Sequence, residues 1–163
     1  KANERGTAYH RVMECLNYSK AGSTEDIKNE IDRMVREEKL SLKQAECIKL
    51  KDIDTFAGSS IGERIKRAYA YGGVKREQPF VFEYDRQLVQ GVIDLYFIED
   101  GQLVIVDYKT DRVLRGRAGE DELRRRYSIQ LDYYAMALSQ ITGLKVKEKV
   151  IYSFALGRSL TVE

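Results

Sequence analysis

Two aspartates and a lysine lie in and beside apolar segments in the middle of this chain. Asp94 interrupts the segment Leu88 to Ile98, and Asp107 interrupts the segment Leu103 to Tyr108, which Lys109 follows directly. Both segments are rich in β-branched and aromatic residues, which predicts two strands. Acidic and basic groups within such strands make these three residues the first candidates for an active site.

A hairpin between these two strands brings the aspartates together. Asp100-Gly101 is a strong turn signal, and a turn centred there pairs Glu99 with Gln102. Unless a β-bulge shifts the strands, the same register places Asp94 opposite Asp107, with Cβ atoms about 4.5–5.5 Å apart. Like charges at that distance resist ionisation, and a bound divalent cation removes the repulsion. Oxygen ligands favour a hard ion, so we expect Mg²⁺, with Mn²⁺ or Ca²⁺ able to substitute.

Lys109 belongs to the same predicted face as Asp107, because side chains alternate along a strand. An ammonium group beside two metal-binding carboxylates can orient a water molecule or offset the charge on a phosphate. A solvated lysine at the end of a strand is an equally good interpretation of so short a spacing. The residues by themselves therefore leave the role of Lys109 open.

A basic segment follows the second of these strands. Between Arg112 and Arg126, six arginines and three acidic residues leave a local net charge of +3. Arginines placed there could bind phosphates and lead a single strand to the site, and a solvated loop is the alternative. The candidate DNA contacts are Arg112, Arg115, Arg117, Arg124 and Arg125.

The composition is that of an ordinary globular domain. The 163 residues are 43% hydrophobic and 33% charged, and we expect one domain over residues 1–163 with its own core. A net charge of only +2 excludes a uniformly basic nucleic-acid binder. Two cysteines cannot form a disulfide framework, and no apolar run is long enough to span a membrane. We expect a cytoplasmic location and, because the chain begins at Lys1, a domain excised from a longer protein.

The elements that position these residues change in character near Pro79, the only proline. Helical periodicity dominates before it and strand patterns dominate after it. A long amphipathic helix is predicted from about Glu120 to Ile141, and a last strand from Val150 to Ala155. Four earlier helices and a first strand are predicted near Thr7 to Leu16, Ile27 to Val35, Leu40 to Leu50, Ile61 to Tyr71 and Phe80 to Tyr84. This order predicts an α/β fold in which helices flank both faces of a mixed β-sheet.

The run Gly91-Val92-Ile93-Asp94, followed by Asp107-Tyr108-Lys109, resembles the nuclease core of the PD-(D/E)XK superfamily. Three further motifs of the family have counterparts in Gly6-Thr7-Ala8-Tyr9-His10, Glu77-Gln78-Pro79-Phe80 and Gln130-Leu131-Asp132-Tyr133-Tyr134. All five occur in the family's order and are most similar to RecB-like nuclease domains of bacterial helicase–nucleases. Because cysteines for an iron–sulfur cluster are lacking, the likeness is to the A-subunit type of AddAB rather than the B-subunit type. The resemblance implies a restriction-endonuclease-like sheet with a helical N-terminal part.

The resemblance also implies a set of metal ligands: His10, Asp94, Asp107 and the backbone carbonyl of Tyr108. In the family, the lysine equivalent to Lys109 completes catalysis. His10 is the only histidine, and we expect it in the first turn of a helix that Thr7 caps. There the helix dipole disfavours protonation and keeps the imidazole available for a metal.

Four more residues are candidates for the site: Gln130 and Tyr134 as catalytic residues, and Glu77 and Glu14 in accessory roles. The resemblance places Glu77 near the active site, and brings Gln130 and Tyr134 close to DNA and the catalytic groups. Gln130 and Tyr134 share one face of the predicted helix, and a plain core position is the alternative for Tyr134. Glu14, one turn after His10, is either a group that holds the histidine or an ordinary solvated glutamate.

The function implied by the resemblance is that of a magnesium-dependent deoxyribonuclease. It would hydrolyse single strands during the processing of DNA double-strand breaks for recombinational repair, as the exonuclease of an ATP-dependent helicase–nuclease. A helicase motor in the same chain would deliver the DNA ends, a second helicase–nuclease subunit would be a partner, and no membrane is involved. The alternatives are a catalytically silent module that binds DNA ends or docks to a partner, and a free-standing restriction-type endonuclease.

Overall fold

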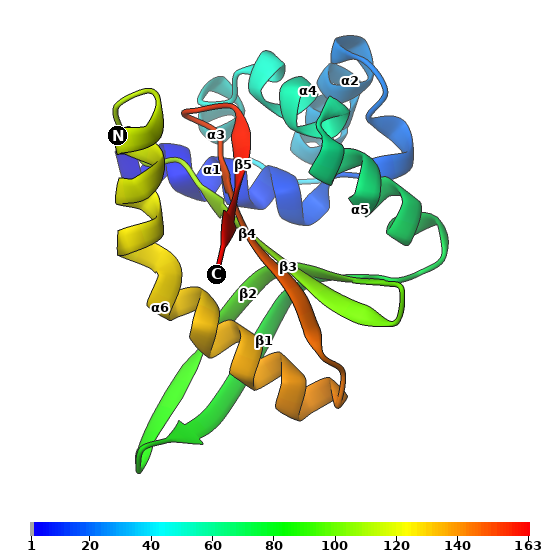
Figure 1. The fold of residues 1–163 in the computed structure, drawn as a ribbon. Coiled ribbons are helices and arrows are strands. Elements are labelled where there is room, and N and C mark those ends of the chain that lie inside the picture. Colours follow the sequence, from blue (N-terminus) through cyan, green and yellow to red (C-terminus); the bar gives the residue numbers. More distant parts are fainter. Residues whose placement is uncertain (1) are drawn as a thin grey trace. The chain divides into compact units, whose positions relative to one another are not determined.

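The computed structural model describes residues 2–163, which form two compact units (Figure 1). The first unit, residues 2–71, is helical, and the second unit, Gly72–Glu163, contains the β-sheet. The helices of the first unit are α1 (Ala2–Cys15), a short 3-10 helix (Tyr18–Lys20), α2 (Thr24–Arg36), α3 (Leu42–Glu46), α4 (Leu50–Gly58) and α5 (Ser60–Ala70). Within residues 2–163, no helix combines the length and the apolar character needed to cross a membrane.

Serine side chains cap the N-termini of three helices of the first unit. Ser23, Ser41 and Ser59 each accept a hydrogen bond from a backbone N–H in the first turn of α2, α3 and α5, which satisfies donors that have no partner inside the helix. The single helix predicted over Leu40 to Leu50 is wrong, because the chain breaks between α3 and α4. Tyr9 stabilises this break: its hydroxyl accepts from the N–H of Lys49 at 3.2 Å and donates to Asp52 at 2.5 Å.

The second unit contains five strands and one long helix: β1 (Val74–Tyr84), β2 (Gln87–Glu99), β3 (Gln102–Lys109), α6 (Arg117–Thr142), β4 (Val146–Ser153) and β5 (Arg158–Val162). They form one mixed sheet in the order β1-β2-β3-β4-β5, in which only the pairing of β3 with β4 is parallel. The helix α6 connects those two strands and packs across one face of the sheet (Figure 1). The predicted α/β class, with a mixed sheet, a flanking helix and a helical N-terminal part, is confirmed, whereas helices on the second face of the sheet stay a prediction.

The core of the second unit lies between α6 and the sheet. The helix contributes Leu123, Leu131, Tyr134 and Leu138, which pack against buried strand residues. These four residues form the buried face that an amphipathic helix predicts, whereas Ile141, the predicted end of the helix, is 55% exposed. On the other face of β3, Val104, Val106 and Tyr108 are also buried, as expected for a central strand.

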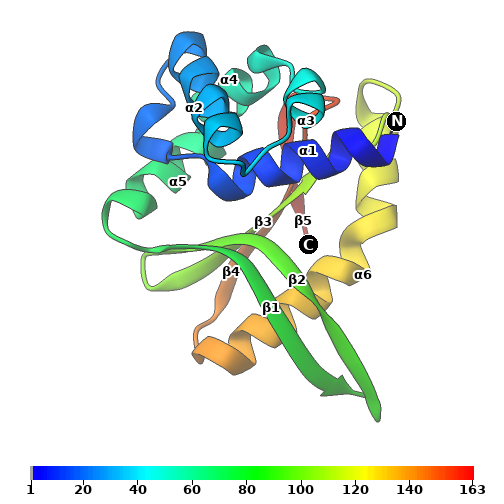
Figure 2. The same ribbon diagram turned by 180° about the vertical axis from the view of Figure 1, so that it is seen from behind.

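The ends of the sheet differ from the prediction. The first strand begins at Val74 rather than Phe80 and runs through Pro79. A proline is tolerated there because β1 is an edge strand, where one side of the backbone needs no sheet partner. The strand β5 was not predicted, since only Leu160 and Val162 of its five residues are buried. The hairpin of β1 and β2 extends beyond the other strands (Figure 2).

Candidate active site

The hairpin of β2 and β3 has the register that was expected from its turn. Glu99 pairs with Gln102, and the register continues to Leu95 and Val106. The next position along each strand is an aspartate, Asp94 on β2 and Asp107 on β3. The register therefore brings the two carboxylates to the same end of the hairpin.

The side chain of Asp94 takes part in the backbone geometry of β3. Its Oδ2 atom accepts a hydrogen bond of 2.9 Å from the N–H of Tyr108. The N–H and C=O of one strand residue point to the same side, so the Tyr108 carbonyl also points toward β2. The carbonyl of Lys109 points the opposite way and accepts from Phe154 on the β4 side at 3.0 Å. The carbonyl predicted as a metal ligand is thus oriented toward Asp94.

Asp107 is buried, with only 2% of its surface exposed. Burial, and then the negative charge of Asp94, raise the pKa of Asp107 to about 7, against the opposing effect of Lys109. Its buried Oδ2 has no partner of hydrogen-bonding geometry within residues 2–163, although Lys109 Nζ lies 3.0 Å away. A carboxylate oxygen that is buried, repelled and incompletely bonded fits a divalent cation well.

Few protein groups gather at this point. Within the described part of the chain, no group of three or more histidine, cysteine, aspartate and glutamate side chains is placed to hold a metal ion. Asp94, Asp107 and the Tyr108 carbonyl, the oxygen groups of the second unit that were predicted as ligands, stay a prediction in that role.

Lys109 is held at the site. Its side chain is 15% exposed, so the solvated-lysine interpretation does not hold. Its Nζ donates to Gln130 Oε1 at 3.1 Å in addition to the ion pair with Asp107. Gln130 comes from α6, so this bond joins the end of β3 to the helix and gives Gln130 the polar partner that its place in an apolar stripe requires.

Tyr134 has a place both in the core and at the site. Its ring packs edge-on against Phe80 at a centroid distance of 5.5 Å and is 7% exposed. Burial, followed by the charges of Asp107, Asp94 and Glu77, raises the pKa of Tyr134 well above its usual range. The Tyr134 hydroxyl therefore stays protonated, and it is close enough to these carboxylates for their charges to raise its pKa.

Glu77 has a strained backbone opposite Asp94. Arg76 pairs with Leu95 and Gln78 pairs with Ile93, so the intervening Glu77 lies across from Asp94 on β1. Glu77 adopts a φ of 48°, in the left-handed region that is unfavourable for a residue with a Cβ. Such irregularities in edge strands commonly redirect a side chain toward a site.

His10 lies in the helical unit, in the middle of α1. The expected cap is wrong, because α1 begins at Ala2 and Thr7 lies within the helix, where its hydroxyl donates to the Asn3 carbonyl at 2.9 Å. The helix-dipole argument for a neutral imidazole therefore does not apply. His10 Nδ1 lies 2.9 Å from the Gly6 carbonyl. When Nδ1 donates its proton to this carbonyl, the lone pair lies on Nε2, which is then the nitrogen available to a metal.

The metal-ligand role of His10 stays a prediction, because the histidine and the aspartates belong to different units. Glu14 forms an ion pair with Arg11 at 2.9 Å. Its accessory role toward the histidine stays a prediction.

The predicted DNA-contacting arginines fall into two groups. Arg124 is tied to Asp121 at 3.3 Å and to the Thr161 carbonyl at 3.0 Å, and Arg117, although highly exposed, lies 3.9 Å from Asp121. Three others are exposed and make no hydrogen bond or ion pair to residues 2–163: Arg112, Arg115 and Arg125. The predicted DNA contacts of all five arginines stay predictions, and those three have no competing protein partner within residues 2–163.

Sequence reasoning placed Tyr127 only in the apolar stripe of the long helix, and it gave Asp111 no role at the site. The Tyr127 ring centroid lies 4.0 Å from Lys109 Nζ, and its hydroxyl donates to Asp111 Oδ2 at 2.6 Å. The spacing contained a signal, because Tyr127 precedes Gln130 by three residues and so shares its helix face.

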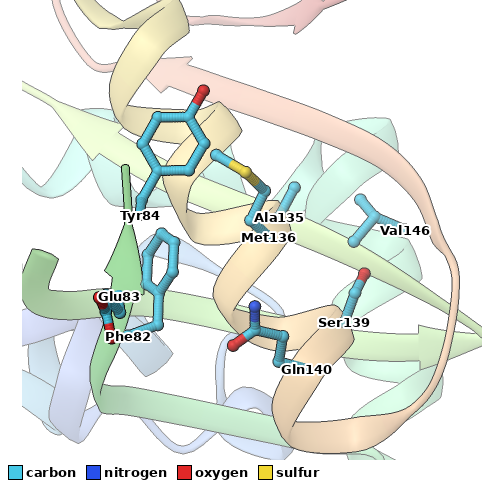
Figure 3. Close-up of a pocket in the computed structure, with 8 residues that line it drawn as sticks. All are labelled: Phe82, Glu83, Tyr84, Ala135, Met136, Ser139, Gln140 and Val146. Carbon is cyan, nitrogen blue, oxygen red and sulfur yellow. The ribbon is translucent and has the colours of Figure 1, made fainter. Parts of the chain in front are cut away.

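A pocket of about 450 Å³ lies elsewhere in the second unit, between the β1–β2 hairpin and the C-terminal half of α6 (Figure 3). Phe82, Tyr84, Met136 and Val146 give it a largely apolar lining, and Glu83 is its only charged residue. None of the predicted site residues lines it, so it is separate from the carboxylate pair.

Comparison with known proteins identifies the family of the chain. The family model described as the PD-(D/E)XK nuclease superfamily matches residues 1–160. A crystal structure of a Vibrio cholerae protein matches 94% of this chain and 47% of its own length at a TM-score of 0.35 and 12% identity. A likeness that low supports no inference.

Similar sequences occur in much longer proteins, each named as the A subunit of an ATP-dependent helicase/nuclease. The chain is 36% identical to the one from Clostridium novyi over 94% of its length, and 40% identical to the one from Thermoanaerobacter sp. over 98%. It is 39% identical to the one from Alkaliphilus oremlandii over 94%. The chain spans only 13% to 14% of the length of these relatives.

Proposed function

Because this chain belongs to the PD-(D/E)XK nuclease superfamily, we propose that it is a metal-dependent deoxyribonuclease domain that hydrolyses single-stranded DNA. The observation that carries the proposal is the buried pair of Asp94 and Asp107 with Lys109 held beside it. We further propose that it acts as an exonuclease in the processing of double-strand breaks for recombinational repair.

The ion that we expect is Mg²⁺, with Mn²⁺ or Ca²⁺ able to take its place. Asp94, Asp107 and the Tyr108 carbonyl would hold it, with His10 as a further ligand. When bound, such an ion supplies Lewis acidity to the scissile phosphate and to the attacking water. The incompletely bonded Oδ2 of Asp107 is the feature of the chain that favours this occupant.

The chain's own side chains supply positioning and charge. Lys109, held by Asp107 and Gln130, keeps a positive charge beside the position where negative charge develops on the phosphate. Tyr134 keeps its proton and so acts as a hydrogen-bond donor on the side of the carboxylates. No covalent intermediate with the protein is required.

DNA would reach this site along the basic segment between β3 and α6. Arg112, Arg115 and Arg125 are exposed and unpaired within residues 2–163, and phosphates are their natural partners. The relatives are named as helicase/nuclease chains and are far longer than this one. We therefore propose that a motor in the same polypeptide delivers the strand and that a second helicase–nuclease subunit completes the assembly.

The test of the activity uses Asp107→Asn and Lys109→Met in the 163-residue chain. Each should lower the release of nucleotides from labelled single-stranded DNA with Mg²⁺ by about 100-fold or more, the usual effect of removing a group that stabilises charge. Asp132→Asn and Lys149→Met are matched controls, because these residues form another aspartate–lysine pair of the same unit, at 2.6 Å. Full activity of Asp107→Asn would refute the proposal.

Calorimetric titration with Mn²⁺ tests the metal separately. The parental chain should bind the ion and Asp107→Asn should not. Absence of metal binding together with intact DNA affinity would instead favour a silent DNA-end-binding module. Preferential cleavage of one short duplex sequence would favour a restriction-type endonuclease.

A further inference from the structure

The ammonium group of Lys109 has neighbours on three sides. Asp107 Oδ2 lies at 3.0 Å, Gln130 Oε1 at 3.1 Å and the centroid of the Tyr127 ring at 4.0 Å. A cation at that distance over the face of an aromatic ring is attracted by the ring's quadrupole, and more strongly where water is largely excluded. The ring thus covers a side of the Lys109 ammonium that water would otherwise hydrate.

The Tyr127 ring is itself held in place. Its hydroxyl donates to Asp111 Oδ2 at 2.6 Å, and the same oxygen accepts from Arg126 at 3.0 Å. Asp111 follows β3, whereas Tyr127 and Arg126 belong to α6. The two bonds therefore join the loop directly after the proposed catalytic strand to the helix that carries Gln130.

This arrangement is more specific than packing requires. A phenylalanine or leucine would fill the same space between strand and helix. Neither could donate a hydrogen bond to Asp111, as the Tyr127 hydroxyl does. Burial, and then Asp111, raise the pKa of Tyr127 to about 12, so the hydroxyl remains a donor at neutral pH. Gln130 and Tyr127 contact Lys109 from positions three residues apart on one helix face.

We propose that Tyr127 is a positioning residue of the nuclease site, which sets the location of the Lys109 ammonium through its ring and is oriented by Asp111. The effect of Tyr127 on kcat rests on the proposed function. Its effect on the position of the Lys109 ammonium does not. Tyr127 acts through Lys109, and it is not expected to contact the ion or the reacting atoms.

The test compares Tyr127→Leu, which removes the ring, with Tyr127→Phe, which keeps the ring and removes only the bond to Asp111. Tyr127→Leu should lower kcat on single-stranded DNA about tenfold, in the range of a partly desolvated cation–π contact, with KM nearly unchanged. Tyr127→Phe should recover most of that loss. Tyr133→Leu is the matched control, since Tyr133 also lies on α6 and packs against Phe82 and Tyr84, and its kcat should stay parental.

A nuclear magnetic resonance measurement of the Lys109 side chain separates this inference from the nuclease proposal. The ring current of Tyr127 should displace the Lys109 Hε resonances upfield in the parental chain and in Tyr127→Phe, and the displacement should vanish in Tyr127→Leu. Its persistence in Tyr127→Leu would overturn the inference, even if the chain hydrolysed DNA. Its disappearance in a chain without nuclease activity would support the positioning role while refuting the proposed function. A change in KM alone, or an equal loss of kcat in Tyr133→Leu, would also overturn the inference.

Discussion

Two residues of the candidate site have conformations or charges that lower the stability of the fold. Asp107 is a carboxylate buried beside Asp94, and its pKa is raised because the charged form is disfavoured there. Glu77 has a φ of 48° on an edge strand, and a residue with a Cβ pays about 1–2 kcal/mol in that region. Unfavourable features of this kind concentrate at functional sites, where the surrounding structure enforces them.

Replacing Glu77 with glycine should therefore separate stability from activity. Glu77→Gly relieves the strained φ and should raise the free energy of unfolding by about 0.5–1 kcal/mol, after the entropy cost of glycine is subtracted. The same change removes a carboxylate across from Asp94 and should lower nuclease activity. Chemical denaturation and the single-strand assay measure the two effects.

Glu38→Gly is the control for this prediction. Glu38 has a φ of 59° at the end of α2 and is exposed. It should gain similar stability and keep parental activity. Equal activity of the two glycine variants would show that the strain at Glu77 has no role in the reaction.

At the scale of elements, the contact of β1 with α6 depends on a glycine of β2. Gly91 pairs with Phe80 across β1 and β2, and a Cβ added at Gly91 would meet the Phe80 ring at 3.0 Å. The same ring packs against Tyr134 of α6. A missing side chain on one strand thus lets an aromatic ring of the neighbouring strand support a tyrosine of the site.

Gly91→Ala should consequently destabilise the protein by about 1–3 kcal/mol, as overpacking of a tight contact usually does. Because Phe80 must move, the position of Tyr134 and the nuclease rate should change with it. Gly58→Ala is the matched control: Gly58 ends α4, and no atom lies within 4 Å of an added Cβ. That variant should be slightly more stable, by about 0.5–1 kcal/mol. Stability of Gly91→Ala equal to the parental value in urea denaturation would contradict the prediction.

At the scale of the whole molecule, charge is nearly balanced, with a net charge of +2. Any strong attraction to DNA must then come from local groups. Ion pairs already engage Arg124 and Arg126, which leaves the exposed Arg112, Arg115 and Arg125 as the local source. This distribution predicts how DNA affinity depends on salt.

Changing Arg112, Arg115 and Arg125 together to glutamine should weaken single-strand binding and flatten its salt dependence. Three lost phosphate contacts at about 0.7 per contact should reduce the slope of log K against log salt by about 2. The control replaces three exposed basic residues of the helical unit, Lys28, Arg36 and Lys51, with the same loss of net charge. An equal flattening in both triple variants, measured by fluorescence anisotropy, would show that the arginine segment is not the DNA path.

Several features of the fold followed from local patterns. The turn at Asp100-Gly101 and the alternation of its strands predicted the register of β2 and β3, which the structure confirms. The long periodic helix was also predicted, within three residues at its start. Short or irregular elements were not: the break between α3 and α4 depends on a bond from Tyr9, which no local window contains.

The sequence by itself determined the hairpin register and therefore the approach of Asp94 to Asp107, because a two-residue turn and the period of a strand leave little freedom. Tertiary structure alone decided what surrounds Lys109. Gln130 and Tyr127 reach it only because α6 packs back across the sheet, and such a contact depends on how the helix packs against the end of β3. For the same reason, the strained Glu77 and the division of the arginines into paired and unpaired groups became visible only in three dimensions.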